Sequence, residues 1–329
     1  MTSLHKARLA WPDYAKGMGI FLVVAGHVLK GLVKASIIPG TGITGFVDAW
    51  IYSFHMPLFF FISGMFVSSS VQKPLGIYTL DKVRSVAYPY FVWCLIQGLI
   101  QIGLSSYTNA PMGFANLIAV LYKPPAQFWF LYVLFVILMI YGVMAKLRIR
   151  EVWFFLFSVA FFFSIEFVSL GQWGVIYMVR ENMIYFGLGI LLSTPVRSVS
   201  FESKAIKPLY FACPAMVILT FCVWYGLEQF LPLRPLLAVI GTLSVIAIAM
   251  ALSAYKTFGI IRQWGEVSLQ IYVAHTIASA GFRIVLQKVF GYESAWLHIT
   301  GGICVGMYFP ILLDHFCRRI GFRYLFSLR

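Results

Sequence analysis

The sequence predicts an all-α, polytopic membrane protein with about ten transmembrane helices in one bundle. Of its 329 residues, 61% are hydrophobic and only 11% are charged, whereas about a quarter of the residues of a soluble domain carry a charge. The apolar residues are gathered in repeated runs of about 20 residues, which is the length of helix that crosses a bilayer. This composition excludes an ordinary soluble domain.

Ten apolar runs define the predicted spans. No low-complexity linker, soluble segment or convincing repeat separates them, so we expect residues 1–329 to form a single membrane-embedded domain with no separate soluble domain. Lys6 and Arg8 precede the first run, but the charges inside that run are not typical of a cleaved signal peptide. The predicted spans are residues 14–36, 43–67, 86–105, 128–145, 152–170, 175–192, 209–227, 235–254, 267–288 and 296–316.

The basic residues indicate how these spans are oriented. With ten spans, 17 of the 25 Lys and Arg residues fall on the side of the two termini and five fall on the opposite side. Because basic residues are enriched in cytoplasmic loops, both termini are predicted to lie in the cytoplasm, with the chain in the inner (plasma) membrane. The net charge of +14 therefore marks topology, and without a basic, aromatic-interleaved surface segment we expect lipid and no nucleic acid as a partner.

The first span carries a polar stripe into the bilayer. On a helix that turns about 100° per residue, Lys16 and His27 lie within about 20° of each other, and Asp13 lies within about 60° of both. Lys34 returns to the same direction, so the stripe runs about 27 Å, close to the thickness of the hydrocarbon core. His27 lies roughly 16 Å from Lys16, near the bilayer midplane. Such groups are costly in hydrocarbon, which predicts that this face lines a cavity or meets a partner.

The second span and the loop after it repeat this pattern. Asp48 and His55 are seven residues apart on one helix face, and His55 reaches the depth of His27. Residues 68–85 are predicted to form a cytoplasmic loop, in which Lys82 and Arg84 approach the third span. Together with Lys16 they could form a phosphate site at a helix mouth. The alternative is that these charges set the topology and extend to the lipid headgroups.

Three further groups of side chains are candidates for a site near the outer half. Trp129 opens the fourth span, where aromatic residues also form ordinary interfacial belts. Glu166, Arg180 and Glu181 lie at the outer ends of the fifth and sixth spans, where they could form a functional ion-paired pocket or purely structural pairs. In the ninth span Tyr272 and His275 share a face, although a single buried histidine is often only a core residue.

In their order along the chain, these pieces resemble the acyltransferase 3 family of integral membrane O-acyltransferases, and the resemblance covers nearly the whole chain. The opening at residues 13–17 is similar in particular to the fucose 4-O-acetylase-like branch. The matching residues are Lys16 and His27, Phe54-His55-Met56-Pro57 with Ser63-Gly64, Lys82-Val83-Arg84 before Tyr88-Pro89-Tyr90, Trp129-Phe130-Leu131, and Gly265-Glu266-Val267-Ser268 with Ile271-Tyr272 and His275.

This resemblance implies an enzyme that takes an acyl group, usually acetyl, from cytoplasmic acyl-CoA and places it on a hydroxyl of a cell-envelope glycan. It also implies that Lys16 and His27 are essential and that Arg84 is important. Lys16 stands where many members have arginine, which keeps the charge but loses bidentate phosphate geometry. Because the chain lacks the soluble domain of some members, membrane helices and short loops must recognise the acceptor.

The chemistry of the residues suggests roles for them within this reaction. A sugar hydroxyl is a poor nucleophile, so neutral His27 is the natural general base, and His55 is the expected neighbour that orients it or donates to the oxyanion. Lys16, Lys82 and Arg84 would bind the CoA phosphates, with Asp13 orienting Lys16. The residues expected along the acceptor route are Trp129, Glu166, Arg180, Glu181, Tyr272 and His275. Direct transfer and an acyl-histidine intermediate both fit this arrangement.

Two other classes of function remain open from the sequence. In a proton-coupled secondary transporter, His27, His55 and His275 would relay protons while the outer Glu and Arg residues bind substrate. A metal site of the three histidines is disfavoured, because no His or Cys pair has i, i+4 spacing and the five cysteines form no C-x-x-C pair. We therefore expect no metal. Acyl-CoA binding with release of free CoA separates the enzyme from the transporter.

Overall fold

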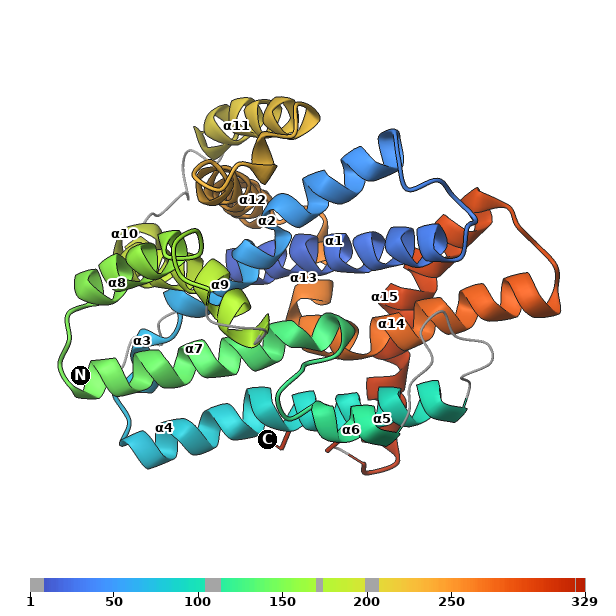
Figure 1. Ribbon diagram of the computed structural model, residues 1–329, viewed down its shortest axis with the longest axis horizontal. Coiled ribbons are helices and arrows are strands. Elements are labelled where there is room, and N and C mark those ends of the chain that lie inside the picture. Colours follow the sequence, from blue (N-terminus) through green and yellow to red (C-terminus); the bar gives the residue numbers. More distant parts are fainter. Residues whose placement is uncertain (1–8, 104–113, 170–173, 199–206, 323, 329) are drawn as a thin grey trace.

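The computed structural model describes residues 9–103, 114–169, 174–198, 207–322 and 324–328, which are helical and contain no strand. Most of the long helices run along the longest axis of the molecule and pack side by side as a bundle (Figure 1). The main helices are α1 (Trp11–Lys34), α2 (Ile43–Met65), α4 (Leu75–Lys82), α5 (Tyr88–Gly103), α7 (Trp129–Lys146), α8 (Glu151–Phe163), α9 (Gly174–Leu191), α11 (Lys207–Trp224), α12 (Arg234–Tyr255), α13 (Gly259–Glu266), α14 (Ser268–Ile284) and α15 (Ala295–Arg319). Short helices α3 (Ser68–Val71), α6 (Phe114–Ala119) and α10 (Ser193–Ser198) connect them.

Within the described residues, eight helices are long and apolar enough to cross a membrane. These eight correspond to predicted spans one to four and seven to ten, which confirms an all-helical, multi-pass membrane architecture. The fifth and sixth predicted spans are also helical, as α8 and α9. However, α8 ends at Phe163, well before the predicted end at residue 170, and α9 carries Arg180 and Glu181 in its middle. The prediction of ten full spans is therefore met by eight spanning helices and two weaker ones.

The prediction of a loop at residues 68–85 is wrong, because most of this segment is helical. Residues 75–82 form α4, which continues through a π-helical turn at Val83–Ala87 into α5, so that Leu75–Gly103 is one candidate span. The outer surface of α4 is apolar, with Leu75, Ile77 and Leu80 exposed. On its inner side the Tyr78 hydroxyl donates a hydrogen bond to the carbonyl oxygen of Leu138 in α7, at 2.8 Å. The charges of the segment hid this amphipathic helix from a search for apolar runs.

Glycine residues set the closest helix contacts. A Cβ on Gly64 would collide with the backbone of Phe186, and one on Gly189 would collide with the backbone of Phe61. This pair of small residues lets α2 and α9 cross with their backbones in contact. At the start of α1, Gly17 leaves no room for a Cβ beside Ile261, and Gly265 leaves none beside Asp13. The short helix α13 is thereby fixed against the first turns of α1, where Asp13 and Lys16 lie.

Candidate active site

Helix α1 presents its polar residues at two depths. Near its start, Lys16 Nζ lies 2.7 Å from Asp13 Oδ1, and this i, i+3 pair is the one expected from the sequence. Asp13 is buried, whereas the Lys16 side chain is 29% exposed. The ammonium group is thus held by a buried carboxylate and remains accessible to a further anion. Eleven residues later, about three turns along the helix, His27 enters the centre of the bundle.

Three histidines meet in that centre, on three different helices. The ring centroid of His27 lies 5.1 Å from that of His275 in α14. His27 also contacts Tyr52 of α2 edge-on, with centroids 6.5 Å apart, and the same Tyr52 ring packs against His55 at 4.7 Å. His55 and His275 are fully buried, at 1% and 0% exposed, whereas His27 is partly exposed. His27 is therefore the histidine of this cluster that keeps some solvent-accessible surface.

The partner of His27 differs from the one expected. The sequence predicts His55 as its neighbour, because both residues reach the same depth. In the structure the Tyr52 ring contacts both His27 and His55, while His275 packs directly on His27. Equal depth in the bilayer fixes only one coordinate, and the azimuth of α2 brings Tyr52 toward α1 instead.

A charged group that the sequence reading did not assign lies one turn further along α1. Lys30 Nζ is 3.7 Å from Asp48 Oδ2 of α2 and 3.2 Å from the centroid of the Tyr52 ring. Both charged side chains are substantially exposed, at 43% and 31%, and the Oδ1 atom of Asp48 is buried without a hydrogen-bond partner. The spacing of Asp48, Tyr52 and His55 at i, i+4 and i+7 was the available signal for this group.

Two of the three cations expected at the cytoplasmic side, Lys82 and Arg84, lie in one continuous helical segment. Lys82 ends α4, and its Nζ lies 5.3 Å from the centroid of the Tyr78 ring. Arg84 is exposed in the π-helical turn that follows. Lys16 lies on a different helix, α1. Two residues before it, the hydroxyl of Tyr14 donates to the carbonyl oxygen of Thr257, which attaches this part of α1 to the segment just before α13. A meeting of the three cations around one phosphate group stays a prediction.

Trp129 and Tyr272 belong to an aromatic layer beside the histidines. Trp129 packs 6.2 Å from Phe60 of α2, and Tyr272 packs 5.5 Å from Phe130, measured between ring centroids. The Tyr272 hydroxyl donates a hydrogen bond to the backbone carbonyl of Gln127, at the start of α7. Tyr272 also lies 6.2 Å from His275. The structure thus places Tyr272 against the histidine cluster, and Trp129 one aromatic layer further away.

The structure separates the three outer residues that were considered together. Arg180 is buried and donates hydrogen bonds to the carbonyl oxygens of Phe161 and Val168 and to the hydroxyl of Ser164. These groups lie at the carboxyl end of α8, where helical carbonyls have no partner within the helix. Arg180 therefore caps α8, which explains why the helix ends early. Glu166 is exposed in the same turn.

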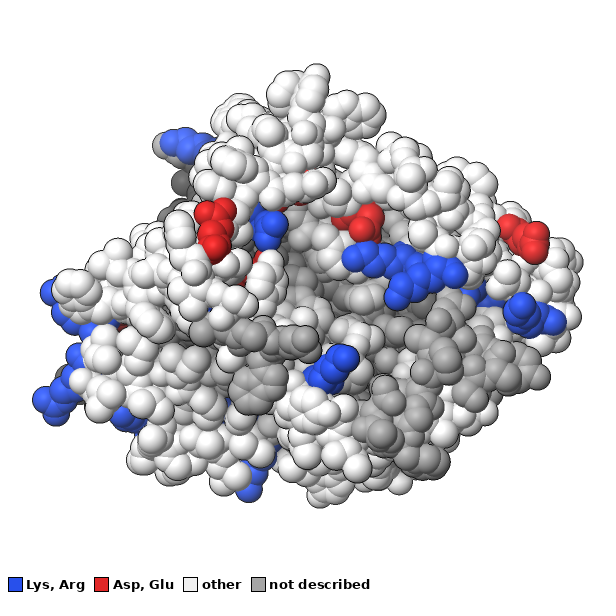
Figure 2. Space-filling view, in the orientation of Figure 1, with Lys and Arg blue, Asp and Glu red and all other residues white. Residues whose placement is uncertain are grey.

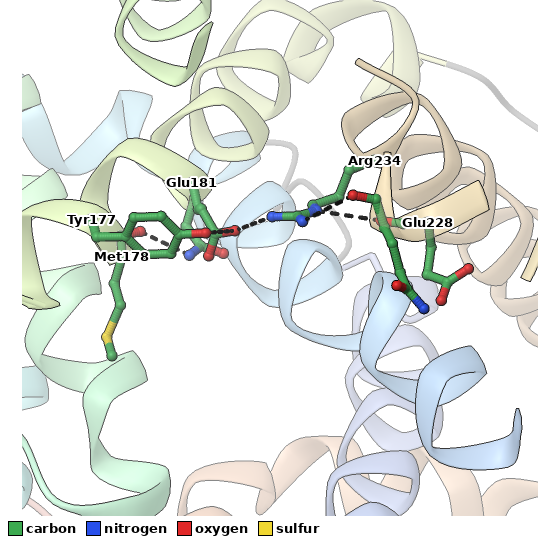
Figure 3. Close-up of polar contacts among 7 residues, drawn as sticks. Tyr177, Met178, Glu181, Glu228 and Arg234 are labelled. Carbon is green, nitrogen blue, oxygen red and sulfur yellow. Dashed lines mark hydrogen bonds and ion pairs between the residues drawn. The ribbon is translucent and has the colours of Figure 1, made fainter. Parts of the chain in front are cut away.

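Glu181 points toward a different helix from Arg180. Its Oε1 atom lies 2.6 Å from Arg234 at the start of α12 and accepts a hydrogen bond from the Tyr177 hydroxyl, at 3.0 Å (Figure 3). Arg234 also donates to the backbone carbonyls of Glu228 and Gln229. This network joins α9 to the turn before α12. The Glu181 carboxylate is therefore used in contacts between helices, and these contacts explain its position without a bound substrate.

On α1, the partly exposed imidazole of His27 lies between two ion pairs, Lys16 with Asp13 and Lys30 with Asp48. Charged side chains are sparse on the face shown in Figure 2, and several of both signs gather around its central hollow. Across the described segments, no group of three or more His, Cys, Asp and Glu side chains is placed to hold a metal ion. An imidazole placed as that of His27 is a group that can take up and release a proton.

Comparison with known proteins agrees with this arrangement. Residues 9–315 match the model of the acyltransferase 3 family, described as an acyltransferase domain. The nodulation protein NolL of Sinorhizobium fredii (strain NBRC 101917 / NGR234) is 26% identical over 214 residues, which cover 64% of this chain and 56% of the relative. NolL of Mesorhizobium japonicum (strain LMG 29417 / CECT 9101 / MAFF 303099) is 23% identical over 190 residues, or 56% of this chain and 48% of the relative. The chain thus spans about half the length of these curated relatives, and no solved structure matches it. Because the family model covers nearly the whole chain, this protein belongs to the acyltransferase 3 family.

Proposed function

We propose that this chain is a membrane O-acyltransferase of the inner (plasma) membrane, with both termini in the cytoplasm. It moves an acyl group, in the first place acetyl, from cytoplasmic acyl-CoA to a hydroxyl of a cell-envelope or exported glycan, with His27 as the general base. One observation carries the proposal most directly. On a single helix, a reachable imidazole lies between a paired cation near the start, Lys16 with Asp13, and a second paired cation toward the end, Lys30 with Asp48.

The donor enters from the Lys16 end in this proposal. Lys16 keeps an exposed ammonium group on a buried carboxylate, which suits an anionic ligand such as the phosphates of CoA. Lys82 and Arg84 would add further positive charge from the segment between α4 and α5. The thin pantetheine arm would then bring the thioester along α1 to His27, a distance of roughly 16 Å along the helix.

The acceptor approaches from the opposite side. The Asp48 side chain is 31% exposed, so its carboxylate can accept a hydrogen bond from a sugar hydroxyl, and Lys30 can donate one. Of the predicted acceptor residues, His275 contacts His27 directly and Tyr272 contacts His275, so both would support His27 from its buried side. Trp129 lies further away, against Phe60 and Phe130, and keeps its place near the acceptor only as a prediction. Arg180 and Glu181 are left out, since their hydrogen bonds are used to join helices, and Glu166 is left out because it lies exposed beside that cap.

The reaction follows from these positions. An unprotonated nitrogen of His27 takes the proton of the acceptor hydroxyl while the oxygen attacks the thioester carbonyl. The new carbon–oxygen bond forms, the carbon–sulfur bond breaks, and the proton passes from the imidazolium to the CoA thiolate. Removing a general base of this kind slows a reaction by about 10² to 10⁴.

The test uses purified full-length protein, [¹⁴C]acetyl-CoA and an envelope glycan fraction as the acceptor. His27→Gln is compared with His298→Gln, which replaces another buried histidine that contacts a backbone carbonyl through one ring nitrogen. We expect thiol release and glycan labelling to fall together by at least about 10² in His27→Gln, and to persist in His298→Gln at equal abundance and thermal stability. Wild-type protein that neither binds acetyl-CoA nor releases thiol would contradict the proposal and favour a proton-coupled transporter.

A further inference from the structure

We propose that His275 is the positioning residue of the acyl transfer: its Nε2 atom accepts a hydrogen bond from His27 and so keeps the other nitrogen of His27 unprotonated toward the acceptor. The inference rests on the proposed role of His27 as the base, and it names the partner that this base needs. A lone imidazole populates two tautomers and several orientations, and a hydrogen bond at one nitrogen selects among them.

The hydrogen bonds of His275 fix its own tautomer. Its Nδ1 atom lies 3.1 Å from the carbonyl oxygen of Ile271 and 2.8 Å from that of Tyr272. A carbonyl oxygen can only accept, so the proton of the neutral ring resides on Nδ1, and Nε2 carries a lone pair. The hydroxyl of Thr276, 3.2 Å from Nε2, can donate to this lone pair while His27 is turned away. His275 is therefore available to His27 as an acceptor.

The hydrogen bonds of Nδ1 orient the His275 ring, and close helix packing holds its backbone in place. The side chain is fully buried in α14. Gly306 of α15 lies against it, and a Cβ at Gly306 would collide with Ser279 and press on Val24 of α1. Ser279 in turn donates to the carbonyl oxygen of Gly302 at 2.9 Å. Helices α14, α15 and α1 are thus held at a fixed separation around His275.

The distance between the two rings is the one that such a hydrogen bond needs. Two imidazoles joined by an N–H···N bond of about 2.9 Å have centroids about 5 Å apart once the two ring radii are added. The centroids of His27 and His275 are 5.1 Å apart, with the ring planes tilted by 54°. Because His275 is fixed, rotation of the partly exposed His27 ring aligns the bond, and catalytic hydrogen bonds often align only when substrate binds.

His55 cannot take this part in the same way. Its Nδ1 atom also bonds to a backbone carbonyl, that of Ile51, at 2.7 Å. The tautomer of His55 is therefore the same as that of His275. However, Tyr52 packs edge-on against both His55 and His27, so the ring in direct contact with His27 is that of His275.

Proton movement through the pair is simple. Neutral His27 donates its N–H to Nε2 of His275 and takes the acceptor proton on its other nitrogen. The resulting imidazolium keeps the hydrogen bond to His275 and gives the second proton to the CoA thiolate. His275 changes no bond, so it acts only by orienting His27 and stabilising its charged form.

The test compares two amides at position 275. In His275→Gln the amide reaches the place of Nε2, whereas in His275→Asn it reaches only the place of Nδ1, so the two variants differ in the group offered to His27 but not in chemical class. The first readout is the rate at which diethyl pyrocarbonate modifies His27 in the full-length protein, followed by peptide mass spectrometry. This readout needs no acceptor and no turnover. His298→Gln is the matched control for loss of a buried histidine.

We expect His27 to be modified at close to the wild-type rate in His275→Gln and in His298→Gln, and about fivefold more slowly in His275→Asn, the factor expected for one hydrogen bond. With acetyl-CoA, the kcat for thiol release should follow the same order, while the KM for acetyl-CoA stays constant. Equal rates in the Asn and Gln variants, whether both high or both low, or an equal loss in His298→Gln, would overturn the inference. If His27→Gln retains thiol release, the proposed function fails, and the modification rates still decide whether His275 is paired with His27.

Discussion

The histidine cluster at His27 and the capped ends of α8 and α9 both place polar groups inside apolar helices, but they use them differently. At the capped ends, Arg180 directs hydrogen bonds to the two carbonyls and the hydroxyl around it, and Glu181 meets Arg234 at 2.6 Å. At the cluster, Lys30 and Asp48 are 3.7 Å apart, one oxygen of Asp48 has no partner, and His27 is partly exposed. A buried oxygen without a partner does not by itself separate the two regions, since Glu228 beside the capped ends has one as well. What differs is that the charged groups at the capped ends are tied to helix ends, whereas Lys30 and Asp48 make a longer and more exposed pair beside His27.

Among the variants that test this comparison, we expect the largest change in stability for Arg180→Leu. Arg180→Leu removes the donor to the Val168 carbonyl and to the Ser164 hydroxyl, while the Phe161 carbonyl keeps its bond from Ser164. Hydrogen bonds to a charged group are worth about 1.5 to 3 kcal/mol each. We expect a loss of about 3 kcal/mol in stability, measured as a lower thermal midpoint in detergent. The specific activity of the folded fraction should be unchanged. A stable variant with altered acceptor preference would instead place Arg180 in the site.

The next effect concerns the donor end. Lys16→Gln removes the accessible ammonium group beside Asp13, so we expect the KM for acetyl-CoA to rise about tenfold, since a charge-assisted hydrogen bond is lost. Stability should also fall, because the buried Asp13 carboxylate loses its ion pair, so the KM is measured on the folded fraction. Arg318→Gln serves as the control, because it removes another exposed cation from an ion pair within one helix. An unchanged KM with a lower kcat would move Lys16 from donor binding to the chemical step.

A smaller effect is expected on the acceptor side. Asp48→Asn keeps the shape of the side chain but removes the charge that faces Lys30. We expect the KM for the glycan acceptor to rise about threefold to tenfold, as for one weakened hydrogen bond, with the KM for acetyl-CoA unchanged. Competition kinetics with both substrates varied would show this split. A rise in the KM for acetyl-CoA instead would put Asp48 on the donor route.

The smallest effect is expected at Glu181. Glu181→Gln keeps a hydrogen bond to Tyr177 or Arg234 and weakens an ion pair whose side chains are 25% and 33% exposed. Pairs with this exposure contribute about 0 to 1 kcal/mol. The thermal midpoint should fall by only a few degrees, and transfer should persist. A loss of transfer at full stability would contradict its purely structural role.

The sequence predicted the relative positions of side chains correctly where all of them lie on one helix. The stripe of α1, with Asp13, Lys16 and His27, followed from helical spacing alone, and the Asp13–Lys16 pair is present. Contacts between helices were not predictable in the same way. Helical spacing gives the depth and direction of a side chain but not the rotation of the neighbouring helix, so His55 was placed next to His27 where the structure has His275.

The same limit applies at the helix ends. Apolar runs located the helices, but Arg180 read as a partner for acidic residues because its true partners are backbone carbonyls, which every sequence contains. Likewise, α4 was missed because it is short and ends in two charged residues, Asp81 and Lys82, although Tyr78 anchors it to α7. In the segment Leu75–Gly103, the charged residues were taken as a sign that the helix had not yet begun, whereas they lie within a continuous helical segment.

The most direct test of the central claim is sided transfer in sealed proteoliposomes of known orientation. [¹⁴C]Acetyl-CoA is supplied only on the face that carries the termini, and the glycan acceptor is enclosed on the other face, with wild type, His27→Gln and His298→Gln reconstituted at equal density. We predict labelled glycan on the far side for wild type and His298→Gln, and a loss of at least about 10² for His27→Gln. Label that reaches the glycan equally well in His27→Gln, or only when donor and acceptor share one face, would contradict an acyl transfer across the bilayer at His27.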